Sequence, residues 1–373
     1  MRAEVDAIHE VESTGTSFVM STGAPTIHLT EADARRFCDE FFSQLGMQDR
    51  EIADCTDILV ETSLRGVDSH GIALVATFAE RIRSGQMRPG CTLFVRREAA
   101  STAWVDGQQG MGPSLARRCV HMAMDKARRT GIGAISLADG NYVGALAPYL
   151  LPIAEAGFFG LAAANSTPRV APLGGREGVH GTNPIAWIAP VVDGDPLLFD
   201  AATGHAAARI RQAADEGRPL APGIALDADG NPTTDPAAAT AGTLLPVGGA
   251  LGFGLGLLVG VLTGGLADGP VGTQVPPVSD WSSAYGASLF ILVVDPAGFG
   301  GVEAFSRRCA DLCTAVQMTE PMAGGDPVRS PGERARMCRQ QRQVDGIPMS
   351  RLHWEAVLKR LADCDLDLSR WDA

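Results

Sequence analysis

The pattern of apolar positions predicts that the first ninety residues or so are mainly helical. Phe37, Phe41 and Leu45 recur at helical spacing after Thr30, a residue type that caps helix N-termini, and a glycine follows that run. We expect a second helix over about residues 48–64 and a third over about 73–85. A polar turn, Gly66-Val-Asp-Ser-His-Gly-Ile72, separates the second helix from the third.

The middle and the end of the chain alternate short apolar strands with helices. Strands are expected at residues 102–106, 132–137, 158–164, 185–190, 196–199 and 289–294, and helices at about 113–129, 145–156, 302–317, 332–343 and 351–363. Residues 219–247 are rich in proline, glycine and threonine, so we interpret them as a long surface excursion. This alternation predicts a mixed α/β layer.

One segment, Leu251 to Leu266, is almost wholly apolar and is long enough to cross a bilayer. It is full of glycine, lacks basic flanks and has no aromatic belt, so we predict a buried helix between two layers. Its Gly252-Phe-Gly254-Leu-Gly256 run follows no clear strand, and a Rossmann nucleotide motif needs one.

Composition narrows the class of protein. The chain has 373 residues, enough for two lobes with separate cores, and 45% of them are hydrophobic, which excludes general disorder. The net charge of −12 and the lack of a basic stripe argue against nucleic acid as a partner. Residues 1–25 are polar and lack a secretory signal, so we expect a flexible tail, a cytoplasmic protein and no membrane partner.

The eight cysteines are scattered, and we expect reduced thiols. Cys309 and Cys313 share a helix face, but no second ligand pair accompanies them, so no metal site is predicted.

Three short segments carry candidate chemistry. In Asp68-Ser69-His70-Gly71 the histidine can act as a general acid near neutral pH, and the serine beside it can hold the ring or relay a proton. Gly181-Thr182-Asn183 and Asp200-Ala-Ala-Thr203 offer small residues and polar groups to a ligand. Each segment also fits a purely structural turn or helix cap.

Seven motifs occur together in a characteristic order: SLRGVDSHG, DGNYVGALAPY, GTNPIAWIAP, FDAAT, DADGNPTTDP, LPVGGALGFGL and SPGE. Their order and spacing resemble the malate/L-lactate dehydrogenase family of non-Rossmann type, which includes ureidoglycolate and sulfolactate dehydrogenases and piperideine-2-carboxylate reductase. The resemblance runs from about Thr26 to the C-terminus.

The resemblance implies an α/β fold with a non-Rossmann nucleotide lobe and a mainly helical lobe built from both chain ends. We assign residues 26–98 and 299–373 to the helical lobe and 99–298 to the cofactor-binding lobe. It also implies a homodimer that binds NAD or NADP in the cleft between the lobes, with a small molecule as substrate.

The resemblance also implies roles for individual residues. His70 corresponds to the proton donor and Ser69 to its relay partner, and Tyr142 stands beside the nicotinamide. The implied cofactor-binding residues are Tyr142, Val143, Gly144, Ala145, Leu146, Asp200, Ala201, Ala202, Gly332 and Glu333. The implied substrate-side positions are Leu74, Phe78, Thr182 and Leu251.

Several of these positions depart from the family pattern. Leu74 stands in place of an arginine that grips the substrate carboxylate, Phe78 in place of an aromatic hydroxyl, and Leu251 in place of a lysine. Tyr142 replaces a histidine and Gly204 a serine. An unpaired carboxylate is costly to bury, so a small 2-oxo acid is an unfavourable substrate unless Arg65, Arg81 or Arg169 reaches the cleft.

Three hypotheses follow from these departures. In the first, the protein is an NAD(P)H-dependent reductase of a C=N or C=O group in a larger, less charged metabolite of specialised biosynthesis, with His70 or Tyr142 giving the proton. In the second, the fold is reused by a redox-neutral isomerase, lyase or cyclase. In the third, the chain is an inactive partner subunit. The sequence does not choose between NAD and NADP.

Overall fold

The computed structural model describes residues 25–277, 280 and 282–371. Its centre is a mixed seven-stranded sheet in the order β2-β3-β4-β11-β5-β6-β7. The strands are β2 (Phe94–Glu98), β3 (Thr102–Asp106), β4 (Ile132–Gly140), β5 (Phe159–Ala164), β6 (Ile185–Ala189), β7 (Leu197–Ala201) and β11 (Ala287–Val294). Only β3 and β4 pair in parallel, and the other neighbours are antiparallel.

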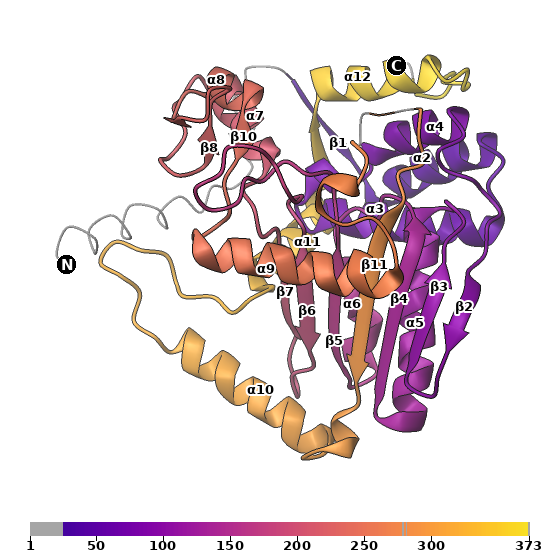
Figure 1. The fold of residues 1–373 in the computed structure, drawn as a ribbon, viewed down its shortest axis with the longest axis vertical. Coiled ribbons are helices and arrows are strands. Elements are labelled where there is room, and N and C mark those ends of the chain that lie inside the picture. The colour runs from indigo at the N-terminus through magenta and orange to yellow at the C-terminus, as the bar shows by residue number, and fades with distance from the viewer. Residues whose placement is uncertain (1–24, 278–279, 281, 372–373) are drawn as a thin grey trace.

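Helices cover both faces of this sheet. On one face lie α5 (Gly112–Thr130) and α6 (Ala147–Glu155), whose apolar side chains join those of the strands in one core. On the other face α9 (Ala250–Gly260) and a π-helical turn at Val261–Gly265 cross the strands (Figure 1). Another helix, α10 (Val302–Gln317), contributes Cys309 to a small cluster with Ala189 and Leu197 of β6 and β7.

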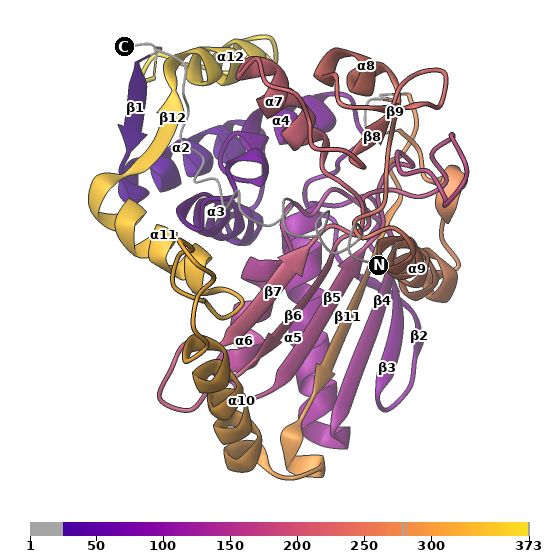
Figure 2. The ribbon, with the colours of Figure 1, turned by 90° about the vertical axis from the view of Figure 1, so that its left-hand side faces the viewer.

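Segments from the two ends of the chain form a second core. Figures 1 and 2 place four of its helices at one end of the sheet: α2 (Glu31–Gln44), α3 (Asp49–Leu64), α4 (Leu74–Arg83) and α12 (Arg351–Ala362). The strands β1 (Thr26–Leu29) and β12 (Ile347–Ser350) form an antiparallel pair beside these helices. The helix α11 (Glu333–Asp345) precedes β12 in the chain. Phe37, Phe41 and Trp354 are among the buried residues of this core.

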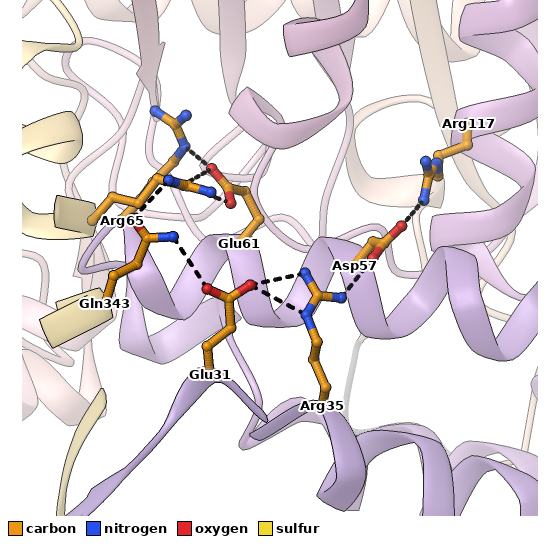
Figure 3. Close-up of polar contacts among 8 residues, drawn as sticks. Glu31, Arg35, Asp57, Glu61, Arg65, Arg117 and Gln343 are labelled. Carbon is orange, nitrogen blue, oxygen red and sulfur yellow. Dashed lines mark hydrogen bonds and ion pairs between the residues drawn. The ribbon is translucent and has the colours of Figure 1, made fainter. Parts of the chain in front are cut away.

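Charged side chains join α2 and α3 to helices from distant parts of the chain (Figure 3). Asp57 pairs with Arg35 of α2 at 2.7 Å and with Arg117 of α5 at 2.8 Å. Burial alone would raise the pKa of Asp57, but the two guanidinium groups outweigh burial and hold that pKa below its ordinary value. Glu61 of α3 likewise pairs with Arg339 of α11 at 3.0 Å. The ion pairs therefore link α2 and α3 to α11 and to α5, which packs on the sheet.

Most of the predicted elements are confirmed. The capped first helix begins after Thr30, whose hydroxyl accepts from the Asp33 N–H at 3.0 Å. The predicted helices over about 48–64, 73–85 and 113–129 correspond to α3, α4 and α5. All eight cysteines are free thiols. The predicted N-terminal tail, residues 1–25, falls outside the described residues apart from Pro25.

Two interpretations of the sequence need correction. The excursion at 219–247 contains a three-stranded sheet of β8 (Ala225–Leu226), β9 (Pro232–Thr233) and β10 (Thr243–Leu244), together with α8 (Pro236–Ala241). These elements pack with α7 (Ala207–Asp215), a helix that the sequence analysis missed, around their own small core. Short paired strands give too few alternating positions to be recognised from one sequence.

The apolar segment 251–266 is the second correction. It is helical as predicted, but only one of its faces is buried. Leu251, Leu257, Leu258, Val261 and Leu266 are between 43% and 70% exposed. Two of its glycines face inward instead: a Cβ on Gly256 would lie 2.4 Å from the ring of His180, and one on Gly252 would lie 2.1 Å from a backbone oxygen. Among the helices that the structure describes, none is both long and apolar enough to span a bilayer.

Candidate active site

The Ser69-His70 pair lies in a 3-10 turn, Asp68–His70, between α3 and α4. Ser69 Oγ is 2.7 Å from Nδ1 of His70. Asp68 anchors the turn through an ion pair with Arg342 of α11, whose Nη2 lies 3.0 Å from the carboxylate. Gly71 is needed because a Cβ there would lie 1.9 Å from Ser63 Oγ. The structure thus brings the serine and the imidazole together in a braced turn.

Burial lowers the pKa of His70 below its ordinary value of 6.5, and the positive charge of Arg211 lowers it further. The imidazole is therefore largely neutral at neutral pH and gains its proton only in more acidic solution. A neutral imidazole whose Nδ1 is hydrogen-bonded to the Ser69 hydroxyl can accept a proton, or orient a substrate, through its other nitrogen.

Tyr142 lies over the His70 ring. The two ring centroids are 6.2 Å apart and their planes differ by 22°. The Tyr142 N–H donates to Asn141 Oδ1 at 2.9 Å, which fixes the start of the loop. Burial raises the pKa of the Tyr142 phenol well above its ordinary value, so the hydroxyl keeps its proton at neutral pH. Two groups able to move a proton therefore stack on each other.

The loop after Tyr142 offers unused hydrogen-bond donors. Within the described part of the chain, the backbone N–H groups of Val143, Gly144 and Ala145 donate to no acceptor. Gly144 adopts a φ of 76°, in the left-handed region. Buried or partly buried N–H groups almost always find a partner, and a run of them suits a phosphate or carboxamide oxygen. This run fits part of a nicotinamide dinucleotide.

The end of β7 meets the same loop. One carboxylate oxygen of Asp200 accepts from the N–H groups of Leu146 and Ala147, each at 2.8 Å, and so caps α6. Ala201 is the last residue of the strand, and Ala202 follows it. Thr203 donates to the Thr182 carbonyl oxygen at 3.1 Å. The structure therefore gathers Leu146, Asp200 and the Thr182 segment around one end of the sheet.

Leu74 begins α4 and faces the predicted cofactor loop. Its Cδ1 would lie 3.7 Å from a Cβ placed on Gly144. An aliphatic side chain thus stands where the resemblance places a carboxylate-binding arginine, and it contributes no charge beside Gly144.

Three other predicted positions lie apart from the Ser69-His70 turn. Phe78 is fully buried in the terminal core, where its ring stacks on Phe42 at 6.3 Å. Leu251 is 70% exposed at the start of α9. Gly332 packs against Leu198 near the start of β7, because a Cβ on it would lie 2.9 Å from the Leu198 Cβ.

Glu333 follows Gly332 and begins α11. Its carboxylate accepts from the Ser330 N–H and from Gln317 Nε2, each at 3.1 Å. Gly332 and Glu333 line a cavity of about 360 Å³ whose wall also includes Arg65 and Arg336. The lining of that cavity does not include His70 or Tyr142, so it is a separate hollow along β7.

Of the three arginines considered as replacements for the missing cation, one lies beside the site. Arg81 is 1% exposed, and its guanidinium carbon is 4.9 Å from the ring centroid of Tyr285. Arg65 pairs with Glu61 at 2.7 Å on the other side of α3, and Arg169 is exposed. The register of α4 could have pointed to Arg81, because it lies seven residues after Leu74 on the same helix face.

Two neighbours of the site were missed by the sequence analysis. Tyr285 precedes β11 and is buried, and nothing in its sequence context marks it. Arg211 lies on α7, the unpredicted helix, and its charge acts on His70. Both come from segments far along the chain, and only the fold brings them close. No cluster of metal-binding side chains occurs among residues that the structure describes.

Comparison with known proteins finds relatives that cover most of the chain. The chain is similar to malate/(S)-sulfolactate dehydrogenase of Methanothermus fervidus, with 29% identity over 335 residues, which is 90% of this chain and 97% of that protein. Its fold is similar to sulfolactate dehydrogenase from Methanocaldococcus jannaschii, with a TM-score of 0.86, 26% identity, and coverage of 92% and 98% of the two chains. It is also similar to delta1-piperideine-2-carboxylate reductase from Pseudomonas syringae, with a TM-score of 0.80, 27% identity, and coverage of 91% and 99%.

These likenesses confirm the α/β fold expected from the motifs, with helical elements from both chain ends. The sequence profile described as malate/L-lactate dehydrogenase matches residues 29–358, most of the chain. The braced Ser69-His70 turn and the loop of open N–H groups thus occur in an oxidoreductase fold, and this chain belongs to the malate/L-lactate dehydrogenase family.

Proposed function

We propose that the protein is an NAD(P)H-dependent reductase that acts on a C=N or C=O group of a metabolite larger and less charged than a 2-oxo acid. The observation that carries the proposal is the stack of His70 on Tyr142 beside a loop with three open N–H groups. The bound dinucleotide would supply the hydride. A group able to give a proton stands next to donors able to hold the cofactor.

The residues around that stack have different roles in the proposed function. Val143, Gly144 and Ala145 would hold polar oxygens of the cofactor, and Asp200 keeps this loop in place by capping α6. Leu74 leaves the neighbouring wall apolar, which favours a substrate whose reacting carbon has an uncharged neighbour. A substrate of this kind suits a specialised biosynthetic reaction in the cytoplasm.

Titration of the purified protein with NADPH and with NADH tests the first part of the proposal. We expect saturable binding that changes the nicotinamide fluorescence. The variant Gly144→Val should weaken binding, because it adds a β-branched side chain at a left-handed φ and crowds the open N–H groups. Gly174→Val is a matched control, since Gly174 has a φ of 76° and open space around it.

A substrate screen tests the second part. Cyclic imines and ketones without a 2-carboxylate should be reduced faster than small 2-oxo acids. If neither nucleotide binds, the reductase assignment is wrong, and a redox-neutral isomerase, lyase or cyclase becomes the hypothesis to test. If the nucleotide binds but only 2-oxo acids react, the inference from Leu74 is wrong.

We further infer that the protein acts as a homodimer that pairs through the exposed face of α9. Leu251, Leu257 and Leu258 of α9 and Val261 of the π-helical turn are exposed and apolar, and the segment 250–267 has no charged residue. A net charge of −12 disfavours the approach of two copies, and a face without charged residues adds no local repulsion between charges at the contact.

A further inference from the structure

The turn that carries Ser69 and His70 has little of its own to hold it in shape. None of the three residues of this 3-10 turn is buried, and Ser69 is exposed. The bond that closes the turn, from the Gly71 N–H to the Asp68 carbonyl oxygen, is long at 3.4 Å, and hydrogen bonds in 3-10 turns have poor geometry. Gly66 and Gly71 on either side add no side chains that could pack. Contacts from outside the turn must therefore fix it.

Arg342 of α11 contacts both the turn and the end of α3. Its Nη1 donates to the Ser63 carbonyl oxygen at 2.6 Å and to one carboxylate oxygen of Asp68, while its Nη2 donates to the other carboxylate oxygen at 3.0 Å. Ser63 lies in the last turn of α3, before Gly66. Arg342 is only 8% exposed, so the pair is partly shielded from water. One planar guanidinium thus fixes the position of Asp68 relative to α3.

The helix α11 is itself attached to the N-terminal helices, so Arg342 acts from a rigid support. One turn before it, Arg339 Nε donates to both carboxylate oxygens of Glu61 at 3.0 Å. One residue after it, Gln343 Nε2 donates to the Glu31 carboxylate at 3.2 Å (Figure 3). A side chain on a rigid helix holds its target more precisely than one on a loop.

A second, independent contact ties the end of the turn to α3. Ser63 Oγ accepts from the Ile72 N–H at 3.0 Å. A Cβ on Gly71 would lie 1.9 Å from the same oxygen, so the backbone passes directly against α3 at this point. The turn is therefore held on both sides, by the Arg342 guanidinium at Asp68 and by the Ser63 hydroxyl at Ile72.

We propose that Arg342 is a positioning residue that sets the direction of the His70 imidazole in the reduction. The proposal rests on the proposed function and adds the residue that holds its Ser69-His70 turn in place. Between the two contacts, Ser69 Oγ lies 2.7 Å from His70 Nδ1, so Nε2 is the ring nitrogen left to face a substrate. Without the pair between Arg342 and Asp68, the turn is no longer held on that side. A displacement of about 1 Å at a reacting group can cost about 10²-fold in rate.

The chemical shift of His70 Nδ1 reports this geometry without cofactor or substrate. The chain has seven histidines, and in protein labelled with ¹⁵N-histidine the resonances that are absent from His70→Asn belong to His70. Ser69→Ala gives the shift of an Nδ1 without its hydroxyl partner. Spectra at about pH 8 keep the imidazole neutral, because burial lowers the pKa of His70.

Two variants break the pair from opposite sides. Arg342→Gln removes a positive charge and Asp68→Ala a negative one, so an effect of charge alone would move the His70 resonance in opposite directions. A change of position should move it in the same direction in both variants, most of the way from the parent value to the Ser69→Ala value. With NADPH and 1-piperideine, a cyclic imine without a carboxylate, both variants should lower kcat about 10-fold or more, with little change in KM for NADPH.

Arg339→Gln is the matched control. Arg339 lies one turn before Arg342 on α11 and also pairs with a carboxylate of α3, but its hydrogen bonds go to Glu61 and Gln343 rather than to the turn. The variant should leave the His70 shift and kcat unchanged. A shift as large as that in Arg342→Gln would show that any loosening of α11 moves the imidazole, and it would overturn the specific role of Arg342.

Asp68→Ala also covers the case in which Arg342→Gln does not fold, because Asp68 is not buried and its removal leaves no cavity in a core. The proposal is overturned if either variant, once folded, keeps the parent shift of His70, or if the two variants move it in opposite directions. Absence of NADPH binding to the parent would instead overturn the proposed function. The measurement of His70 distinguishes the two failures because it needs neither cofactor nor substrate.

Discussion

Leu74 and Tyr142 stand at two positions where we infer a departure from the family pattern. The Leu74 side chain faces Gly144 and is apolar, whereas the resemblance implies an arginine at this position. Tyr142 carries a hydroxyl that stays protonated through neutral pH, because burial raises its pKa. Under the proposed function, both residues favour a neutral reacting group over a charged substrate that is bound by a cation.

Leu74→Arg should restore activity on 2-oxo acids. A guanidinium at this position can form charge-assisted hydrogen bonds to a carboxylate, and such bonds typically contribute about 1.5–3 kcal/mol. We therefore expect KM for pyruvate or oxaloacetate to fall roughly 10-fold or more. Leu74→Met is the control, since it keeps an apolar side chain of similar volume. Equal KM values for the arginine and methionine variants would contradict this view of Leu74.

The pH dependence of the reduction should reveal which group gives the proton. With Tyr142 as donor, kcat of the parent enzyme should be nearly constant between about pH 6 and 8. In Tyr142→Phe the remaining donor is His70, whose lowered pKa means that the protonated ring is lost as the pH rises through a value below 6.5. The rate of this variant should therefore fall toward neutral pH and drop at least about 10²-fold overall at pH 7.5.

Steady-state rates across that pH range, with His70→Asn as a second variant, check this expectation. His70→Asn should be slower than the parent but equally insensitive to pH, because the phenol is still present. Identical pH profiles for the parent and Tyr142→Phe would show that Tyr142 is not the donor.

The sequence motifs predicted which residues are candidates for the site. They did not predict the direction in which each side chain points. Phe78 occupies a substrate-side position in the family pattern, yet its ring packs into the terminal core beside Phe42. Arg81, three residues further along α4, instead places its guanidinium carbon 4.9 Å from the ring centroid of Tyr285. The rotation of α4 against its neighbours decides this, and that rotation depends on contacts with α2 and α12 that lie far away in sequence.

At the scale of elements, α9 shows how glycine spacing sets a helix packing distance. Gly252 and Gly256 lie on the inner face, where the backbone approaches Thr203, Val247 and His180. Asn183 Nδ2 donates to the Gly256 carbonyl oxygen at 2.9 Å and fixes the contact. Because Asn183 follows Thr182, this packing also positions the loop that meets the end of β7.

Gly256→Ala should destabilise the protein, because its Cβ would lie 2.4 Å from the His180 ring and force the helix outward. We expect the free energy of unfolding to fall by about 1–3 kcal/mol, the usual effect of overpacking a core. Gly254→Ala is the matched control: no atom lies within 4 Å of its added Cβ. It should raise that free energy by about 0.5–1 kcal/mol, because alanine favours helix over glycine.

Urea unfolding of the two variants beside the parent measures both effects. Equal stabilities for Gly254→Ala and Gly256→Ala would contradict the placement of α9. The opposite signs expected for two glycines only two residues apart make this comparison independent of general errors in helix propensity.

Long elements with local signals were predictable, and short elements with distant partners were not. The capped helices at the N-terminal end and the strand β11 carry their patterns within their own sequence. By contrast, β1 pairs with β12, more than 300 residues away, and β2 is exposed along its whole length. The alternation of β1 covers only four residues and β2 has no buried face, so only the assembled fold reveals these two strands.

The whole molecule presents an apolar face where a protein of this charge should present charge. Val261 is 61% exposed and Leu257 47%, one turn apart on the outer side of α9 and the π-helical turn (Figure 1). The sequence pattern of this segment predicted a helix buried between two layers. Within one chain it is covered on one side only, which is the reason for assigning the other side to a second copy.

Leu257→Glu should therefore convert the dimer to a monomer. In a symmetric pair each copy contributes the same residue, so the substitution brings two carboxylates into an apolar interface without cations to pair them. Sedimentation velocity at micromolar concentration should show the parent as a dimer and Leu257→Glu as a folded monomer. Leu352→Glu is the matched control, because Leu352 is 67% exposed on α12, away from α9, and its substitution should leave the dimer intact. A monomeric parent chain would contradict the proposed dimer. A Leu257→Glu variant that is still a dimer would show that the interface lies on another surface than α9. Because α9 also packs on Asn183 beside the Thr182 loop, loss of the dimer should raise KM for the substrate. The far-ultraviolet circular dichroism spectrum of the variant should stay the same as that of the parent.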